Sequence, residues 1–427
     1  MRGYLTVLAG RDFRRLWLGA SISLVGDGMT AVALSWLVLD QPGGVGRLGW
    51  LGFWYTAPVL VGGWLVGPLL DRFDKRHVLA ADSLLRGASV ATVPVGHALG
   101  GVPDWLPFLV AACYGLLKMA PLAGVPAAIP ELVDAEDLDA ANALESIAYA
   151  VSGIVGFSAS GALVSMLGAP WVLAVDAATF WCFALCVLGV RRPLAPRRDT
   201  PGDQPGPRAR DRRLTALLRD PAVLHTTLAF MAFNVAEGAL VLVAAPWLAK
   251  ERLPGGPATL ALLLAGLSAG ELIGGLVAGT WRPEVARVRA IAAAQLTAAV
   301  GFLAVLATGH RLVVAAGFTV IGALGVLMTV WAQSLRMERV PAELRGQAFA
   351  ALRTLMQATP PLGSLVAAPL LARSQLTFAA LAMAALAGLP ALTLLTGRAT
   401  APAPAPAPDG TASAADGGAA LIGDEAP

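Results

Sequence analysis

The chain has 427 residues, of which 56% are hydrophobic and 14% are charged, and its mean hydropathy is +0.68. Soluble globular proteins are about 45–50% apolar and about 25% charged, so this composition excludes an ordinary soluble domain. The formal net charge is only +3, and three of the 31 basic residues are lysine, which gives no reason to expect a nucleic-acid partner.

Apolar runs that reach the ~20 residues of a bilayer-spanning helix recur along the chain. Read between charged residues and Pro or Gly breaks, they predict an all-α polytopic membrane protein with twelve transmembrane helices. The predicted spans lie at 16–39, 48–70, 78–100, 106–129, 141–167, 170–190, 221–248, 257–280, 289–309, 312–335, 348–372 and 376–397.

The distribution of basic residues predicts the orientation. With the N-terminus inside, the inner segments hold 25 bases and Lys118 lies in mid-membrane. The outer loops hold only Arg47, Lys250, Arg252, Arg311 and Arg373. By the positive-inside rule both termini are therefore predicted to be cytoplasmic.

A Pro-rich and Arg-rich segment at 191–219 separates the first six spans from the last six. Its composition predicts a flexible cytoplasmic linker between an N-terminal six-helix bundle at 1–190 and a C-terminal one at 220–397. The low-complexity tail at 398–427 is predicted to be disordered.

The two halves also match one another at an offset of 207 residues. The sequence GWLVG, which ends at Gly67, corresponds to GELIG, which ends at Gly274. Asp27 corresponds to Asn234. Two parallel six-helix repeats around a central site are typical of secondary transporters.

Charged residues within predicted spans are candidates for the transport site. An ionised group near a bilayer centre costs roughly 2.5–3.5 kcal/mol, so it usually faces a cavity or a partner. Asp27, Lys118 and Glu237 fall in the first, fourth and seventh spans and are interpreted as substrate- or proton-binding residues. The two acids would bind a cationic substrate or exchange protons. The alternative is a structural ion pair of Lys118 with Asp27 or Glu237. Glu271 in the eighth span is interpreted as a packing or gating residue.

Glycines spaced four apart let helix backbones approach closely, which alternating access requires. The pairs Gly63 with Gly67 and Gly270 with Gly274 are predicted to pack helices in this way.

Other motifs do not predict an enzyme, a cofactor or a metal site. Gly266 to Gly270 matches the nucleophile elbow Gly-x-Ser-x-Gly, but Ser268 lies in an apolar helical run without the strand that the motif needs. The four histidines lack metal-ligand spacing, and no Walker A lysine follows a glycine-rich loop.

The stretch GPLLDRFDKRH at 67–77 resembles the loop between the second and third helices of the major facilitator superfamily, and the resemblance extends over residues 10–397. Asp74 stands where that family usually has glycine. The matching residues, which the resemblance assigns to a gate, are Gly67, Asp71, Arg72, Lys75 and Arg76.

Within the superfamily, three stretches are similar to the bacterial branch of enterobactin exporters and macrolide-efflux pumps. They are DFRRLWLGASISLVGDGMTAVALSWLVL, AAIPELVDAEDLDAANAL and VPAELRGQAFAALR. The resemblance implies a monomer in the bacterial inner membrane. It also implies proton-coupled efflux of small amphiphilic molecules such as drugs, macrolides or siderophores.

In this superfamily the first, fourth, seventh and tenth helices line the cavity, which adds Asn234, Trp331 and Gln333 to the candidate substrate residues. The fifth helix of antiporters carries a glycine series with a Gly-Pro pair. Here the series is partial, because Phe157 follows the second glycine; its members are Gly153, Gly156 and Gly161.

The resemblance also implies a gate in which Asp71 contacts the cytoplasmic start of the eleventh helix. The positive end of that helix favours an anion, and Arg353 would add a partner. This gate is expected to hold the outward-facing state. The position 207 residues after Asp71 is Ala278, so the gate is expected in one repeat only.

Two other functions remain open from the sequence. An uptake permease for a small metabolite would use the same fold in the opposite direction. A non-transporting membrane sensor is less consistent with the intramembrane acids, because a scaffold has little reason to bear their insertion cost.

Overall fold

The computed structural model describes residues 2–194, 220–280, 287–339, 356 and 359–395, and these residues contain helices and no strand. Eleven helical segments are long and apolar enough to cross a membrane, and a shorter apolar helix, Pro360–Ala372, lies in the eleventh predicted span. The predicted all-α polytopic fold is confirmed. Residues 195–219 of the predicted linker and the predicted tail at 398–427 lie outside the described residues.

The N-terminal half holds nine α-helices and one short 3-10 helix, Ala135–Asp137. The α-helices are α1 (Arg2–Ala9), α2 (Arg11–Leu39), α3 (Gly44–Thr56), α4 (Pro58–Arg72), α5 (Lys75–Ala98), α6 (Leu106–Leu117), α7 (Met119–Leu132), α8 (Leu138–Leu167) and α9 (Ala169–Leu188).

The C-terminal half holds α-helices interrupted by short π and 3-10 turns. They are α11 (Pro221–Ala239), a π-helix (Leu240–Ala244), α12 (Ala245–Glu251), α13 (Gly256–Thr280), α14 (Arg287–Gly301), a 3-10 helix (Phe302–Leu306), α15 (Arg311–Arg339), α17 (Pro360–Ala372), α18 (Leu376–Leu392) and a last 3-10 turn (Thr393–Leu395).

Two predicted spans are broken near their middle. The second divides at Ala57, which keeps helical φ and ψ of −60° and −39°; Pro58 after it has no N–H to donate to the carbonyl of Trp54, so the hydrogen-bond ladder is interrupted there. The fourth divides at Lys118 into α6 and α7. Pro121 has no N–H to donate to the carbonyl of Leu117, so the regular hydrogen-bond ladder stops at this point.

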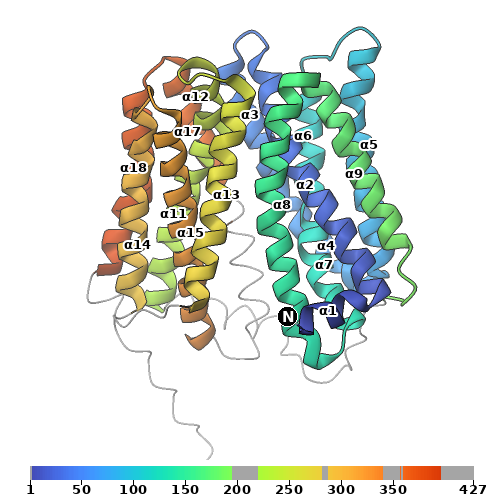
Figure 1. Cartoon of the computed structure of the whole chain (residues 1–427). Helices are drawn as coiled ribbons and strands as arrows, with labels where there is room; N and C mark the ends of the chain where they lie inside the picture. Colours follow the sequence, from blue (N-terminus) through green and yellow to red (C-terminus); the bar gives the residue numbers. More distant parts are fainter. Residues whose placement is uncertain (1, 195–219, 281–286, 340–355, 357–358, 396–427) are drawn as a thin grey trace, which may run out of the picture.

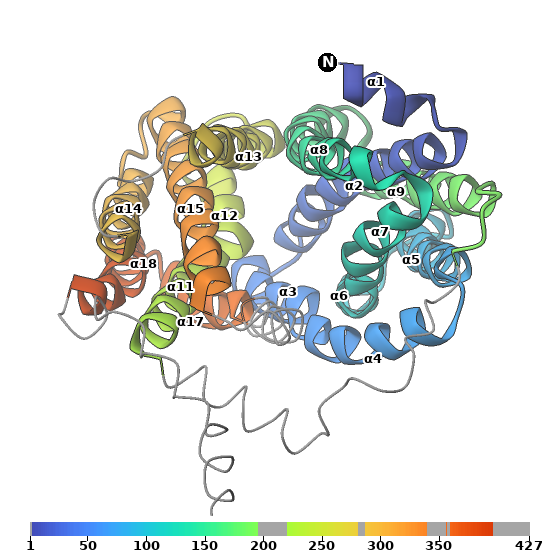
Figure 2. The same cartoon turned by 90° about the horizontal axis from the view of Figure 1, so that it is seen from below.

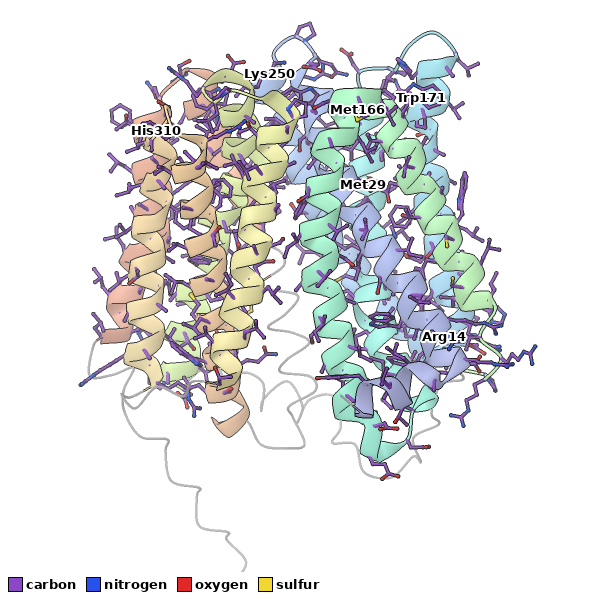
Figure 3. All side chains as sticks on the ribbon, in the orientation of Figure 1. Arg14, Met29, Met166, Trp171, Lys250 and His310 are labelled. Atoms are coloured by element: carbon purple, nitrogen blue, oxygen red, sulfur yellow. The ribbon has the colours of Figure 1, made fainter. Side chains whose placement is uncertain are left out.

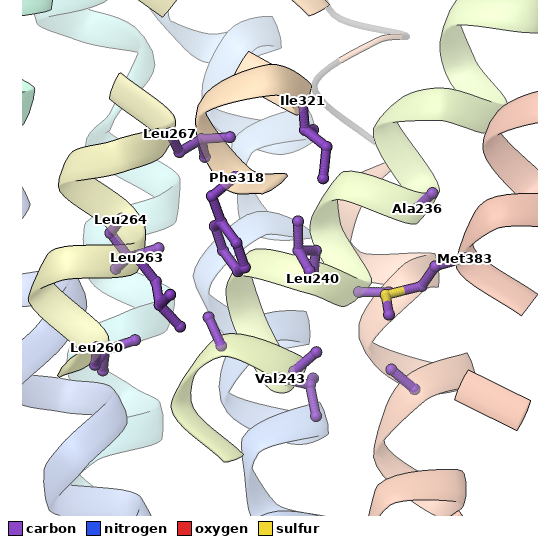
Figure 4. Close-up of a cluster of buried hydrophobic side chains, with 14 of the residues drawn as sticks. Ala236, Leu240, Val243, Leu260, Leu263, Leu264, Leu267, Phe318, Ile321 and Met383 are labelled. Atoms are coloured by element: carbon purple, nitrogen blue, oxygen red, sulfur yellow. The ribbon is translucent and has the colours of Figure 1, made fainter. Parts of the chain in front are cut away.

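The helices gather into two bundles that stand side by side (Figures 1 and 2). In one bundle α2 packs on α8 and α9, and α5 packs on α9. In the other, α13 and α14 pack on α15, while α11 packs on α17 and α18. The interior of the second bundle is built from leucine, phenylalanine and alanine; Figure 4 shows Leu263, Phe318, Leu240 and Met383 among its buried side chains.

Figure 3 distinguishes the two ends of the molecule. Arg14 lies at the end that carries the N-terminus, together with the loop at 73–74 and the segment after α9; we call it the arginine-rich end. Lys250, His310 and Trp171 lie at the opposite end. Met29, in the middle of α2, lies between them.

The two halves are joined at the opposite end. The Ser364 hydroxyl of α17 donates a hydrogen bond to the carbonyl of Gly49 on α3 at 3.1 Å. The ammonium of Lys250 forms an ion pair of 3.0 Å with the Asp40 carboxylate and also donates to the carbonyl of Leu39. These contacts hold the first, second, seventh and eleventh spans together at that end.

A second seam between the halves runs along α8 and α13. A Cβ added at Gly161 would overlap Ala261 and the carbonyl of Pro257, and one added at Gly153 would lie 2.9 Å from the Ser268 hydroxyl. Both glycines lie in the middle or opposite-end part of α8. At the arginine-rich end, by contrast, the face of α4 is uncovered among the described residues: Trp64 is 85% exposed, and nothing lies within 4 Å of a Cβ added at Gly67.

We predict that Lys250→Ala weakens the junction at the opposite end. Exposed ion pairs contribute about 0.2–1 kcal/mol. The ratio of molecules whose two halves are joined at this end to molecules whose halves are separated there should therefore fall by up to about fivefold. Spin labels at residues 101 and 309, on a background without the native cysteines, would report the distance between the two halves by pulsed electron–electron double resonance.

The matched control is Arg47→Ala, which removes an ion pair with Asp104 inside one half. An equal shift in both variants, or no shift in Lys250→Ala, would contradict a role of Lys250 in joining the halves.

Candidate functional site

A buried arginine in the middle of α5 organises the charged residues of the N-terminal half. The side chain of Arg86 is 1% exposed, and its Nε and Nη2 donate to Oδ2 of Asp82, one turn earlier, at 3.0 and 2.7 Å. Its Nη1 lies 3.5 Å from Oδ1 of Asp27 on α2. One buried cation therefore stands between two carboxylates on different helices.

Aromatic rings cover the guanidinium of Arg86. Its Cζ lies 4.4 Å from the ring centre of Phe180 and 5.7 Å from that of Tyr114. Tyr114 stacks on Tyr55 with ring centres 4.7 Å apart, and the ammonium of Lys118 lies 5.9 Å from the Tyr55 ring. Cation–π attraction stabilises both charges where little water can reach them.

Close helix packing sets the position of Asp27. Gly26 faces Asp176 and Thr179 of α9 so closely that a Cβ would overlap them, and the neighbouring Gly28 packs on the backbone of Gly156 in α8. Thr30 and Thr179 both donate hydrogen bonds to the buried Asp176 carboxylate. This structural role of Asp176 fixes α2 against α9.

A cavity of about 70 Å³ lies between α2, α7 and α8. About 10–15 Å³ of such a cavity is enough to hold one water molecule, so the cavity holds an ammonium group or a few waters, and a larger molecule would have to extend beyond it. Apolar side chains such as Leu122 and Phe183 line most of it. The charged and phenolic side chains in its wall are Asp27, Arg86, Lys118, Glu145 and Tyr149.

Asp27 and Lys118 thus line one cavity, as their interpretation as transport residues requires. The alternative of a Lys118 ion pair with Asp27 or Glu237 has no contact within 4 Å to support it among the described residues. Glu237 lies in the other half, on α11, near Glu271 on α13, close enough for the two charges to act on each other. Neither carboxylate forms an ion pair within the described part of the chain.

The structure does not bring the other three predicted substrate residues together with Asp27. Asn234 donates a hydrogen bond of 3.2 Å from Nδ2 to the carbonyl of Met356, which ties α11 to the eleventh span. Trp331 is buried in α15, and Gln333 is exposed on the same helix.

Most of the predicted packing glycines lie at helix crossings. Gly156 packs against the backbone of Val25, and Gly270 and Gly274 pack against the backbone of α15. Gly63 is half-buried, whereas its neighbour Gly62 faces the carbonyl of Leu116 and makes the close approach between α4 and α6.

The loop before α5 explains why aspartate replaces the family's usual glycine. Asp74 is the N-cap of α5: its carboxylate accepts hydrogen bonds from the backbone N–H of Arg76 at 2.9 Å and from Nη2 of Arg76 at 2.8 Å. Its φ of −59° requires no glycine. Burial alone would raise the pKa of the Asp74 carboxyl, but the hydrogen bonds from Arg76 outweigh it and hold that pKa below its ordinary value.

The remaining gate residues divide into two groups. Lys75 is buried, forms an ion pair with Glu131 at the end of α7, and donates its N–H to the carbonyl of Leu194 at 3.0 Å. Asp71 and Arg72 are exposed. The predicted partner Arg353 lies outside the described residues, so the proposed contact between the second and eleventh spans stays a prediction.

Asp82 and Arg86 are site residues that the sequence analysis did not identify. The signal was present: an acid and a base four residues apart on one helix face inside an apolar run can pair with each other. The contact of Arg86 with Asp27, 59 residues away in the chain, depends on how α2 crosses α5.

Comparisons with known proteins agree on the class of molecule. The family described as transmembrane secretion effector matches residues 3–407. Macrolide efflux protein A of Streptococcus pyogenes is 21% identical over 370 residues, which cover 83% of this chain and 88% of that protein. The multidrug efflux pump Tap of Mycolicibacterium fortuitum is 30% identical over 171 residues, 39% of this chain and 42% of Tap, so that match spans less than half of the relative.

Among solved structures, a bacterial homologue of the iron transporter ferroportin in an inward-facing state superposes with a TM-score of 0.70. The sequence identity is 15%, and the superposition covers 92% of this chain and 99% of that one. A likeness at this identity shows the fold alone.

The N-cap predicts a pH-dependent effect of Asp74→Ala. The loss of an N-cap aspartate costs about 1 kcal/mol at neutral pH. The pKa of Asp74 is lower in the folded protein than in the unfolded chain. Its carboxylate therefore stabilises the fold above the ordinary pKa of about 3.9 and loses this effect as the pH falls through the folded value.

Thermal unfolding of the purified protein in detergent checks this. The variant should melt below wild type at pH 7, and the difference should shrink below about pH 4. Asp71→Ala, an exposed acid three residues earlier, is the control and should melt like wild type; an equal effect there would contradict a specific N-cap.

Proposed function

The chain belongs to the transmembrane secretion effector family within the major facilitator superfamily, and on that premise we propose that it exports small amphiphilic molecules with a basic group in exchange for protons. It is a multi-pass membrane transporter with relatives named as efflux pumps. The observation that carries the proposal is the Asp27 carboxylate, which lines a cavity inside the bundle, is 23% exposed, and is held by Arg86 through one long contact.

A carboxylate in this position can hold either a proton or a substrate cation, but not both. That mutual exclusion is the physical basis of antiport, because release of one charge must precede binding of the other. The apolar wall of the cavity suits the hydrophobic body of an amphiphile. Drugs, macrolides and siderophores are examples of such substrates, and Glu237 and Glu271 are proposed as further proton carriers in the C-terminal half.

The orientation and the conformational cycle belong to the same proposal. Placing the arginine-rich end in the bacterial cytoplasm follows the positive-inside rule. The junctions at Gly49 and Lys250 would then close the outer side, so the described conformation would be open to the cytoplasm. Alternating access by a monomer would require these contacts to separate while the gate at Asp71 forms.

The first test is transport by wild type and Asp27→Asn. Expression in an efflux-deficient bacterium should raise tolerance to cationic amphiphiles such as protonated erythromycin or ethidium. Inside-out vesicles should take up ethidium when a proton gradient is imposed. Asp27→Asn should lower the initial rate by about tenfold or more, because the loss of one full charge interaction exceeds about 1.4 kcal/mol.

Asp104→Asn, which changes an exposed acid in a loop at the opposite end, is the matched control and should transport normally. Full activity of Asp27→Asn would remove Asp27 from the mechanism. Accumulation of the compounds in whole cells would instead indicate an uptake permease.

The gate predicts a separate effect of Asp71→Asn. Since Asp71 is exposed in the described conformation, the substitution should leave expression and melting temperature unchanged. It should nevertheless slow ethidium export, because the outward-facing state would lose a partner for the eleventh span. Glu136→Gln, at another exposed acid of the same end, serves as control, and normal export by Asp71→Asn would contradict the gate.

A further inference from the structure

Arg86 has two acidic partners of different kinds. Asp82 lies one turn away on the same helix, so the pair moves as a unit with α5. Asp27 lies on α2 and lines the cavity. The side chain of Asp82 is 2% exposed, against 23% for Asp27, so a substrate can reach only the second acid.

The hydrogen-bond geometry shows which acid holds the guanidinium. Charge-assisted N–H···O bonds are about 2.7–2.9 Å long, and a carboxylate is bound most strongly by two parallel bonds. Both short bonds of Arg86 converge on Oδ2 of Asp82, whereas the Asp27 contact is single and 3.5 Å long. Oδ1 of Asp82 is buried and has no hydrogen-bond partner among the described residues. Asp82 therefore binds Arg86 through Oδ2, and its Oδ1 can still accept a hydrogen bond.

We propose that Asp82 is a positioning residue that retains Arg86 and so keeps the Asp27 carboxylate available to a cationic group of the substrate. This rests on the proposed function, in which Asp27 binds the substrate's charge. Without the negative charge of Asp82, the guanidinium would turn toward Asp27 and occupy the carboxylate itself. Arg86 would then act as an internal competitor of every cationic ligand.

The aromatic rings make this exchange possible without exposing Arg86 to water. Phe180 and Tyr114 contact the guanidinium, so its charge remains covered while its N–H groups change partner. The other charged groups near Asp27 do not replace Asp82: Lys118 is itself a cation, and Asp176 is engaged by Thr30 and Thr179.

The size of the effect follows from the fraction of molecules with a free Asp27. If Asp82→Asn lets Arg86 occupy Asp27 in nine molecules of ten, the apparent dissociation constant for a cation rises roughly tenfold. An uncharged ligand of similar shape would be unaffected, because it does not compete for the carboxylate.

The experiment measures binding of dodecyltrimethylammonium, a permanent cation with a compact ammonium head and an apolar tail, to the purified full-length protein in detergent. Wild type should bind it, and Asp27→Asn should lose most binding. Asp82→Asn should bind roughly tenfold more weakly, and Asp82→Asn/Arg86→Gln should return to within about twofold of wild type because the internal competitor is gone. Asp82→Glu, which keeps the charge, should also bind like wild type.

Ser83→Ala is the matched control, since Ser83 is buried next to Asp82 and its hydroxyl has no hydrogen-bond partner among the described residues. Melting temperatures are recorded for every variant. If Asp82→Asn alone does not fold, the test rests on cation binding by Asp82→Asn/Arg86→Gln. That double variant should fold, because it leaves no unpaired cation in the interior.

Three results would overturn the proposal: wild-type affinity in Asp82→Asn, failure of the double variant to regain binding, or no binding of dodecyltrimethylammonium by wild type. Because binding is measured without transport, failure of export with this pattern intact would refute the proposed function and leave the role of Asp82 standing. If export depends on Asp27 but any of the three results is obtained, the role of Asp82 is refuted and the proposed function stands.

Discussion

A guanidinium ion buried in a membrane-spanning bundle has to be neutralised inside the molecule, and this requirement shapes the N-terminal half. Arg86 is met by Asp82 on its own helix, by Asp27 on α2, and by two aromatic rings from α6 and α9. Four helices must converge on one point to supply these groups. The glycines that flank Asp27 make the convergence possible, because any side chain there would separate α2 from α8 or α9.

The two halves treat charge differently. The N-terminal half combines acids and bases around one cavity, whereas Glu237 and Glu271 in the C-terminal half have no basic ion-pair partner in the described part of the chain. A mixed site can exchange partners at nearly constant net charge. Two neighbouring carboxylates instead disfavour each other's ionised form. The two halves therefore differ in the charged groups that they carry inside the spans, and Asn234 stands at the position that corresponds to Asp27 in the predicted repeat.

The helical spans could be predicted from the sequence because bilayer thickness imposes a strong length requirement on apolar runs. Pro121 indicated the interruption near Lys118. The start of α5 at Lys75 could have been predicted as well, because Asp74 precedes it and aspartate is a preferred N-cap. The site was predicted only in part. Asp27 and Lys118 do share a cavity, but Asn234 contacts a neighbouring helix, because a match between repeats fixes a position along the helix and not the partner it meets. The contact between Asp27 and Arg86 depends on a helix crossing that no local pattern encodes.

The closed seams also decide how a molecule dissolved in the membrane could reach the interior. The contacts of Gly161 with α13 and of Gly49 with α17 seal both lateral sides of the molecule at the opposite end. Lipid tails and hydrophobic solutes diffusing in that leaflet meet continuous helix surface. At the arginine-rich end, Trp64 of α4 is uncovered among the described residues. If the chain exports its substrates as proposed, a compound dissolved in the leaflet at the opposite end could pass sideways only after these seams separate.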